Sequence, residues 1–364
     1  MRTSVSESHY TLKTEQLKRH SLPMACLGVA FHSNGKFAFL ACMDGVYQVE
    51  IESGARQRLY EHDSYASGVV CFAEFNQIVS AGYDGKLIWY DLGTRKIVRQ
   101  IQAHTFWSWD LARAANASVL VSSSGQYLAG GYRYEPKPSE VPSVVAYNAE
   151  SGEAICRMDF LPPVQAVAAS ADGESFGAGN LMGDVAVWNR TGELQSSASS
   201  NDFTAFGHIK SHCQVGGIYA AAFEPKSNDL FVAGMGPMRD PMAGNGKQRW
   251  HRYAWGEENA KLAGKSNDKQ VGEGLMETLA FHPSGDYFVM AGRLRGGNWD
   301  VGFFDTATGD LFHSLKVKRR VTQVEFSRDG TQLILSAAGK QGRDPKKEFG
   351  LIEVYSVSRE AKSA

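Results

Sequence analysis

The sequence predicts an all-β fold built from seven repeated units of antiparallel strands. One pattern recurs along the 364 residues: a strand, a tight turn that ends in Gly or Asp, and a second strand. No helical periodicity of note interrupts the copies. The first strands of the units start near residues 27, 68, 109, 164, 217, 276 and 321.

The tight turns carry the residues that hairpins prefer. In the clearest copies, residues 27–41, 164–178, 276–291 and 321–336, two runs of alternating or β-branched residues flank Asn-Gly, Asp-Gly or Ser-Gly. These dipeptides favour the short turns that connect neighbouring strands. Each copy continues into a third strand, as in "KLIWYD", and several continue into a fourth, as in "RKIVRQIQ". Each unit therefore supplies one four-stranded sheet.

The second unit, residues 61–91, shows the most complete version of the pattern. It reads "EHDSYASGVVCFAEFNQIVSAGYDGKLIWYD" and resembles a repeat of the WD-repeat family. The resemblance covers essentially the whole chain, and it places the family's structural residues at His62, Ser80, Asp84 and Trp89. In the family these side chains form a hydrogen-bonded network that ties the turn before the first strand to the hairpin between the second and third strands. Other units keep only fragments of this set.

The resemblance implies a seven-bladed β-propeller of four-stranded antiparallel blades, formed as a single domain by residues 1–364. The seventh unit ends after its third strand, "LIEVYSVS", and an unpaired strand-like segment at about residues 9–20 precedes the first unit. In WD-repeat propellers the N-terminal strand completes the last blade, so the same closure is expected here. Residues 359–364 are expected to form a disordered tail.

The composition is typical of a soluble globular protein. Hydrophobic residues make up 43% of the chain and charged residues 21%, and the net charge of -1 gives no overall attraction to nucleic acid or membrane. The five cysteines are odd in number, widely spaced and mostly embedded in apolar runs, which indicates reduced, buried thiols. Because no signal peptide and no apolar run of about 20 residues is present, a cytoplasmic protein is expected.

Two groups of residue types suggest chemistry. Ser80 and His62 resemble the nucleophile and base of a hydrolase. The same positions belong to the structural network of the family, however, and no Gly-x-Ser-x-Gly turn presents the serine. His208, His212 and Cys213 are metal-ligand types, but a fourth ligand and a Cys-x-x-Cys pair are missing, and His212 also fits the loop histidine of a blade.

Residues 234–250, "GMGPMRDPMAGNGKQRW", resemble a phosphate loop at Gly-Asn-Gly-Lys. The phosphate-loop motif requires a glycine five residues before Gly246 and Ser or Thr after Lys247, but this chain has Pro241 and Gln248 there. No helix is expected to follow whose N-terminus could hold a phosphate. We therefore expect no catalytic residue, no metal site and no cofactor.

Four insertions lengthen the connections between second and third strands, at residues 131–143, 234–252, 292–300 and 339–349. They contain twelve Lys or Arg against six Asp or Glu, and aromatic residues lie among them. If the family geometry holds, all four emerge on one face, and arginines beside aromatic rings favour a binding surface. The candidate contacts are Arg133, Tyr134, Arg239, Arg249, Trp250, Arg293, Arg295, Trp299, Arg343 and Lys346.

Three further tracts complete the expected surface. The segment "KVKRR" at residues 316–320 adds positive charge before the seventh blade. The tracts "HTFWSWD" and "SLPMAC", at residues 104–110 and 21–26, lie in connections between blades and could place an apolar spot near the channel mouth. Long exposed loops that merely collect soluble residues are the structural alternative, but solubility alone requires neither tryptophan nor one sign of charge.

The sequence therefore favours a non-catalytic WD-repeat scaffold, a monomer by default, that binds an acidic or phosphorylated protein partner through a basic, aromatic-containing loop face. One alternative is a propeller enzyme of the hydrolase or lactonase type. Such an enzyme should show several carboxylates or histidines converging on the innermost strands, and the sequence indicates only Asp300. The other alternative is binding of nucleic acid or a phospholigand by the basic loops, with an affinity that falls steeply with salt.

Overall fold

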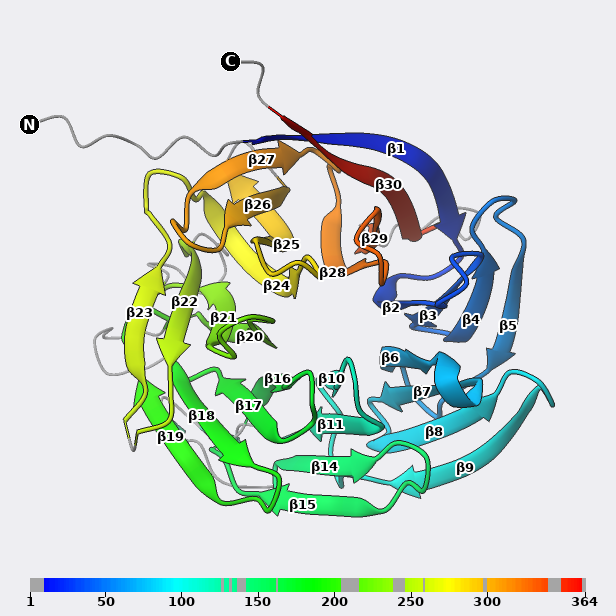
Figure 1. Cartoon of the computed structure of the whole chain (residues 1–364). Coiled ribbons are helices and arrows are strands. Elements are labelled where there is room, and N and C mark those ends of the chain that lie inside the picture. The colour runs from blue at the N-terminus through cyan, green and yellow to red at the C-terminus, as the bar shows by residue number, and fades with distance from the viewer. Residues whose placement is uncertain are drawn as a thin grey trace, which may run out of the picture.

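The protein is a ring of seven four-stranded antiparallel sheets, as the computed structural model shows (Figure 1). The structure describes residues 10–125, 128–130, 133–135, 142–161, 163–203, 216–237, 246–257, 259–296, 300–339 and 348–361. The predicted seven-bladed β-propeller is confirmed. No helix among the described residues is both long and apolar enough to cross a membrane.

The first four blades, from the innermost strand outwards, are formed by residues 26–199. Blade 1 contains β2 (Cys26–Phe31), β3 (Phe37–Cys42), β4 (Gly45–Glu50) and β5 (Arg56–Tyr60). Blade 2 contains β6 (Ala66–Phe72), β7 (Gln77–Gly82), β8 (Lys86–Asp91) and β9 (Lys96–Gln102), with a short 3-10 helix η1 (Ala73–Phe75) after β6. Blade 3 contains β10 (Leu111–Arg113), β11 (Val119–Ser123), β14 (Val144–Asn148) and β15 (Ala154–Met158). Blade 4 contains β16 (Val164–Ala169), β17 (Ser175–Asn180), β18 (Asp184–Asn189) and β19 (Leu194–Ser199).

The remaining three blades follow the same order. Blade 5 contains β20 (Gly217–Phe223), β21 (Leu230–Met235), β22 (Gln248–Ala254) and β23 (Lys261–Lys265). Blade 6 contains β24 (Glu273–Phe281), β25 (Tyr287–Gly296), β26 (Val301–Asp305) and β27 (Leu311–Leu315). Blade 7 contains β28 (Arg320–Phe326), β29 (Gln332–Ala338), β30 (Gly350–Ala361) and β1 (Tyr10–Leu22). A separate hairpin, β12 (Leu128–Gly130) and β13 (Arg133–Glu135), lies between β11 and β14.

The sequence forms these strands because each position in a blade has a characteristic burial. The inner strand β7, with the sequence "QIVSAG", is buried on both faces and is nearly continuously apolar. The outer strand β9, "KIVRQIQ", is mostly exposed and carries polar residues. The hairpin glycines Gly35, Gly173, Gly285 and Gly330 all have a φ of about +70°, from 67 to 73. Glycine adopts this left-handed conformation without the strain that a side chain would add, which confirms the predicted turns.

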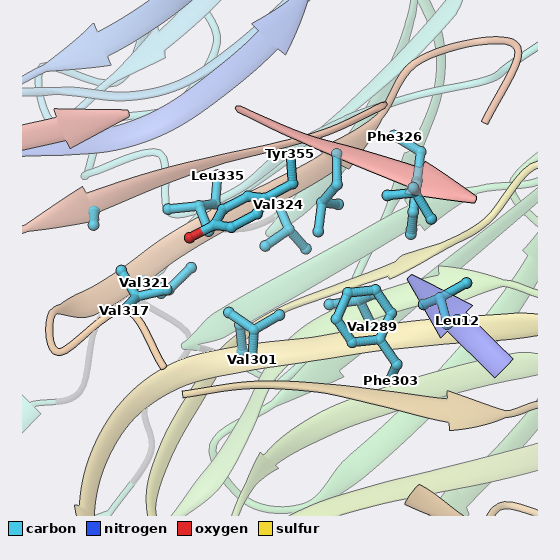
Figure 2. Close-up of a cluster of buried hydrophobic side chains, with 14 of the residues drawn as sticks. Leu12, Val289, Val301, Phe303, Val317, Val321, Val324, Phe326, Leu335 and Tyr355 are labelled. Carbon is cyan, nitrogen blue, oxygen red and sulfur yellow. The ribbon is translucent and has the colours of Figure 1, made fainter. Parts of the chain in front are cut away.

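Seven buried hydrophobic clusters hold the ring together, one at each interface between neighbouring blades. Both faces of every sheet are therefore buried against a neighbour. The cluster between blades 6 and 7 also receives Leu12 from β1, which lies near Val289 and Phe303 (Figure 2). Leu12 is only 3% exposed, so the N-terminal strand contributes to the core as well as to the sheet.

The N-terminal strand closes the ring, as predicted. β1 pairs antiparallel with β30 from Tyr10↔Ala361 to Leu22↔Gly350, and the sheet order is β1-β30-β29-β28. The prediction of a disordered tail from residue 359 is wrong for residues 359–361, because they continue β30 and pair with β1. Strand pairing supplies partners for backbone groups that a tail would leave to water.

The antiparallel order fixes where the connections emerge. Because neighbouring strands alternate in direction, the turns between second and third strands lie at the same end of the ring as the connections from each fourth strand to the next blade. We call this end the loop face. The seven innermost strands surround a channel with a volume of about 410 Å³, and Tyr83 and Trp109 line its end at the loop face. We call this end the channel mouth.

Candidate functional site

A hydrogen-bonded chain in blade 2 joins the connection before β6 to the hairpin between β7 and β8. The imidazole of His62 donates from Nδ1 to Asp84 Oδ1 at 3.0 Å, and its Nε2 lies 2.7 Å from Ser80 Oγ. The hydroxyl of Tyr60 donates to Ser80 Oγ at 2.9 Å. Burial alone would raise the pKa of Asp84, but hydrogen bonds from His62 and two backbone N–H groups outweigh it and hold the pKa below its usual value. This hydrogen-bonded network thus holds the connection before β6 against the hairpin between β7 and β8.

Trp89 does not belong to this hydrogen-bonded network, so the prediction that four residues form the network is wrong for Trp89. Successive side chains of a strand point to opposite faces, and Ser80 lies opposite Ile88 in the β7–β8 register. Trp89 therefore faces the other side of the sheet, where it packs towards blade 3 and donates from Nε1 to Ala149 O at 2.6 Å. Tyr60, which stacks on Tyr90 at 5.3 Å, occupies the place next to Ser80.

The hydrolase and phosphate-loop interpretations find no support in the described geometry. Ser80 is fully buried, so its hydroxyl cannot meet a substrate. β22 begins at Gln248, directly after Lys247, so a strand follows where a phosphate loop needs a helix. His208, His212 and Cys213 lie outside the described residues. Elsewhere in the described chain, no three His, Cys, Asp or Glu side chains are grouped as metal ligands would be.

The channel wall contains charged residues that the sequence did not reveal. Its lining includes Asp110, Glu277 and Glu325, together with Arg113 and Arg320. The expectation that Asp300 alone would reach the channel is therefore wrong. Asp300 instead accepts the backbone N–H groups of Val317 and Lys318, in the connection that precedes blade 7.

Several channel side chains bind the neighbouring blade. Asp110 Oδ2 accepts the N–H of Val167 at 2.9 Å, and Glu325 Oε2 accepts the N–H of Phe31 at 3.0 Å. Innermost strands of adjacent blades do not pair with one another, so these N–H groups need acceptors from side chains. Burial raises the pKa of Asp110 to about 6 and that of Glu325 to about 7. Both side chains therefore link neighbouring blades through hydrogen bonds.

Glu277 and Arg320 form an ion pair close to the channel mouth. Arg320 Nε lies 2.6 Å from Glu277 Oε1, and the Glu277 side chain is only 10% exposed. Burial raises the pKa of Glu277 above its usual value, although Arg320 opposes the shift. Glu277 thus largely neutralises the positive charge of Arg320 at the channel wall.

An aromatic cluster lies on the loop face beside the channel. It consists of Tyr65, Tyr83, Phe106, Trp107 and Trp109. The rings of Tyr83 and Trp107 stack at 4.7 Å, those of Phe106 and Trp107 stack at 5.1 Å, and Trp109 meets Trp107 edge-on at 5.3 Å. Trp107 is 41% exposed and Tyr65 43%, which makes them the most exposed aromatic side chains among the described residues. The apolar spot expected from "HTFWSWD" therefore exists.

Positive charge gathers on the other side of the same mouth. Arg293 in β25 and both Lys318 and Arg319, in the connection before β28, are exposed and have no ion-pair partner among the described residues. We call these three residues the basic flank. Asp300 holds that connection in place, because its Oδ2 accepts the N–H groups of Val317 at 2.7 Å and Lys318 at 2.6 Å.

The ten residues predicted to contact a partner have different outcomes in the structure. The prediction that Trp250 contacts a partner at the surface is wrong, because Trp250 is 3% exposed and packs between Phe231 and Phe288 in the core. Arg249 is mostly buried and binds Asp268 at 2.6 Å, so its charge is already paired. Arg293 is exposed as predicted.

Of the other seven predicted contacts, Arg133 and Tyr134 belong to β13 and Arg295 belongs to β25. Four lie outside the described residues: Arg239, Trp299, Arg343 and Lys346.

Compared with protein-family models and with curated protein sequences, the chain matches none. The fold and the two features at the channel mouth therefore carry the functional argument by themselves.

Proposed function

We propose that this protein is a non-catalytic cytoplasmic scaffold of the WD-repeat type that binds an acidic or phosphorylated protein partner on its loop face. The observation that carries the proposal is the basic flank of Arg293, Lys318 and Arg319, three exposed cations at one side of the channel mouth with no ion pair among the described residues. Neighbouring cations such as Arg320 and Arg249 do have carboxylate partners. Unpaired cations at a rim steer and select anionic partners.

The wall of the channel supports binding over catalysis. An enzyme needs carboxylates with free oxygens poised toward a substrate. Here Asp110 and Glu325 accept hydrogen bonds from the neighbouring blade, and Glu277 binds Arg320. A propeller hydrolase or lactonase that used these carboxylates would share them with these contacts.

A charge reversal tests the proposal. The variant Arg293→Glu, Lys318→Glu, Arg319→Glu should lose the proteins that the intact chain retains in a pull-down from cell extract. A matched control reverses three cations at the opposite end of the ring: Lys36, Lys96 and Arg328. All three are exposed and have no ion pair among the described residues. This control variant should recover the same proteins as the unaltered chain.

Two outcomes would contradict the proposal. One is recovery of the same proteins by the loop-face variant. The other is retention of nucleic acid in place of protein, with an affinity for a DNA duplex that falls steeply as salt rises.

A further inference from the structure

We infer that the aromatic cluster seats an apolar side chain of the partner, next to the acidic groups that the basic flank holds. The ligand is then an extended segment that carries an aromatic or aliphatic residue beside Asp or Glu. This inference rests on the proposed function and adds an apolar contact to the electrostatic one.

The exposed rings are held in position before any partner arrives. The N–H of Tyr83 donates to Tyr65 O at 2.8 Å, and the N–H of Ser108 donates to Gly82 O at 3.1 Å. Trp109 Nε1 donates to Gly125 O at 2.7 Å, which fixes the ring that supports Trp107 edge-on. A rigid surface loses little conformational entropy on binding, so most of the contact energy remains available for affinity.

The same rings are costly to leave in water. Large aromatic side chains dominate the energetics of cores and interfaces. In this cluster, however, Trp107 and Tyr65 keep 41% and 43% of their surface exposed. Tryptophan and tyrosine are also the residue types most enriched at the centres of binding interfaces. The cluster therefore favours an apolar side chain as its occupant.

The cluster and the basic flank share one channel mouth. Tyr83 and Trp109 line the channel together with Glu277 and Arg320. Burial raises the pKa of Tyr83, and the charges of Arg320 and Glu277 act on that pKa in opposite directions. Arg320 is paired with Glu277, whereas Arg293, Lys318 and Arg319 are exposed and have no ion-pair partner among the described residues. A segment that lies across the mouth meets apolar rings on one side and cations on the other.

A phage-displayed library of random dodecapeptides, selected on the intact protein, tests the inference directly. The expected enriched sequences combine Trp, Phe or Leu with Asp or Glu. Binding of the enriched peptides, measured by fluorescence anisotropy, should weaken at least about tenfold in Trp107→Ala, as for a hot-spot residue. Lys318→Glu with Arg319→Glu should weaken it comparably. Leu262→Ala, which alters a side chain 49% exposed on the outer strand β23, should leave it unchanged.

Several results would overturn the inference. They are enrichment of Lys- or Arg-rich peptides, enrichment of acidic peptides without an apolar residue, and no enrichment at all. Unchanged affinity in Trp107→Ala would also overturn it. If Trp107→Ala lost its fold, Tyr65→Ala would be judged by the same criterion. Loss of binding in the charge variant with full binding in both aromatic variants would end this inference and leave the proposed function standing.

Discussion

His104 and Ser122 are hydrogen-bonded inside blade 3, with Nε2 and Oγ 2.8 Å apart. His62 and Ser80 make the same contact in blade 2 at 2.7 Å. In both blades the histidine belongs to the connection before the innermost strand, and the serine lies in the second strand, 18 residues later. Burial lowers the pKa of His104 to about 4, so its ring is neutral near pH 7. The two contacts fasten the connections that carry the aromatic cluster.

Removing either hydroxyl should destabilise the protein. Ser80→Ala and Ser122→Ala each leave a buried imidazole nitrogen without its partner, which costs about 1–3 kcal/mol of the free energy of unfolding. Urea denaturation measures the loss. Ser358→Ala, at an exposed position of β30, is the matched control and should change stability by less than about 0.5 kcal/mol. Equal stability of all three variants would show that these ties contribute nothing.

Trp250 and Trp107 should respond in opposite ways to truncation. Trp250 fills the core between blades 5 and 6, so Trp250→Ala should lower the free energy of unfolding by about 3–5 kcal/mol. Trp107 is 41% exposed, and its truncation should cost less than about 1 kcal/mol. Thermal melts followed by circular dichroism measure both. A larger loss in Trp107→Ala than in Trp250→Ala would contradict the placement of the two rings.

Glu325 should make stability depend on pH. Burial raises its pKa from the usual 4.5 to about 7, so between these values the folded protein binds a proton that the unfolded chain releases. The free energy of unfolding therefore falls as pH rises through this window, by on the order of 1–3 kcal/mol. Glu325→Gln keeps an acceptor for Phe31 N–H but cannot ionise. Its stability relative to the unaltered protein should rise between pH 4.5 and 7, as measured by urea denaturation at several pH values.

The control for this prediction is Glu15→Gln at an exposed position of β1, which should follow the pH dependence of the unaltered protein. A parallel pH dependence in Glu325→Gln would mean that the Glu325 carboxyl is not the group that titrates.

Two glycines in tight turns should differ in their tolerance of alanine. Gly35 and Gly85 both have left-handed φ values, 67° and 73°. A Cβ at Gly35 meets nothing within 4 Å, so Gly35→Ala costs only backbone strain, about 1–2 kcal/mol. A Cβ at Gly85 would lie 2.3 Å from His104 O and 2.8 Å from Phe106 O.

Gly85→Ala should therefore cost more than Gly35→Ala in urea denaturation. It should also shift the tryptophan fluorescence, because the displaced connection carries Trp107. Identical spectra and stabilities would indicate that the connection yields freely.

The fold could be predicted from the sequence because its signals are local. Gly35, Gly173, Gly285 and Gly330 mark hairpins within a few residues, and seven such units suffice to suggest a ring. The sequence pattern places Trp250 in a loop, whereas β21 and β22 extend into the insertion. The pairing Met235↔Gln248 brings Trp250 inside the sheet, and the sequence does not show where a strand pair ends.

The channel mouth could not be assembled in the same way. Asp110 binds Val167, which is 57 residues away, and Arg320 binds Glu277 from the adjacent blade. Tyr65, Tyr83 and Trp107 come from three different connections. These contacts depend on the rotation between successive blades, which no short pattern encodes. The tract "HTFWSWD" indicates the aromatic cluster, whereas no short pattern indicates which residues of the innermost strands face the channel.

The pairing of β1 with β30 sets an order of events during synthesis. β1 leaves the ribosome before every other described strand, but its partner Gly350–Ala361 emerges only after all the other blades. Until then Leu12 has no core to enter, and the growing chain is an open arc with unpaired edges at both ends. We expect a protein of this kind to acquire its protease resistance late and in one step, when the arc becomes a circle.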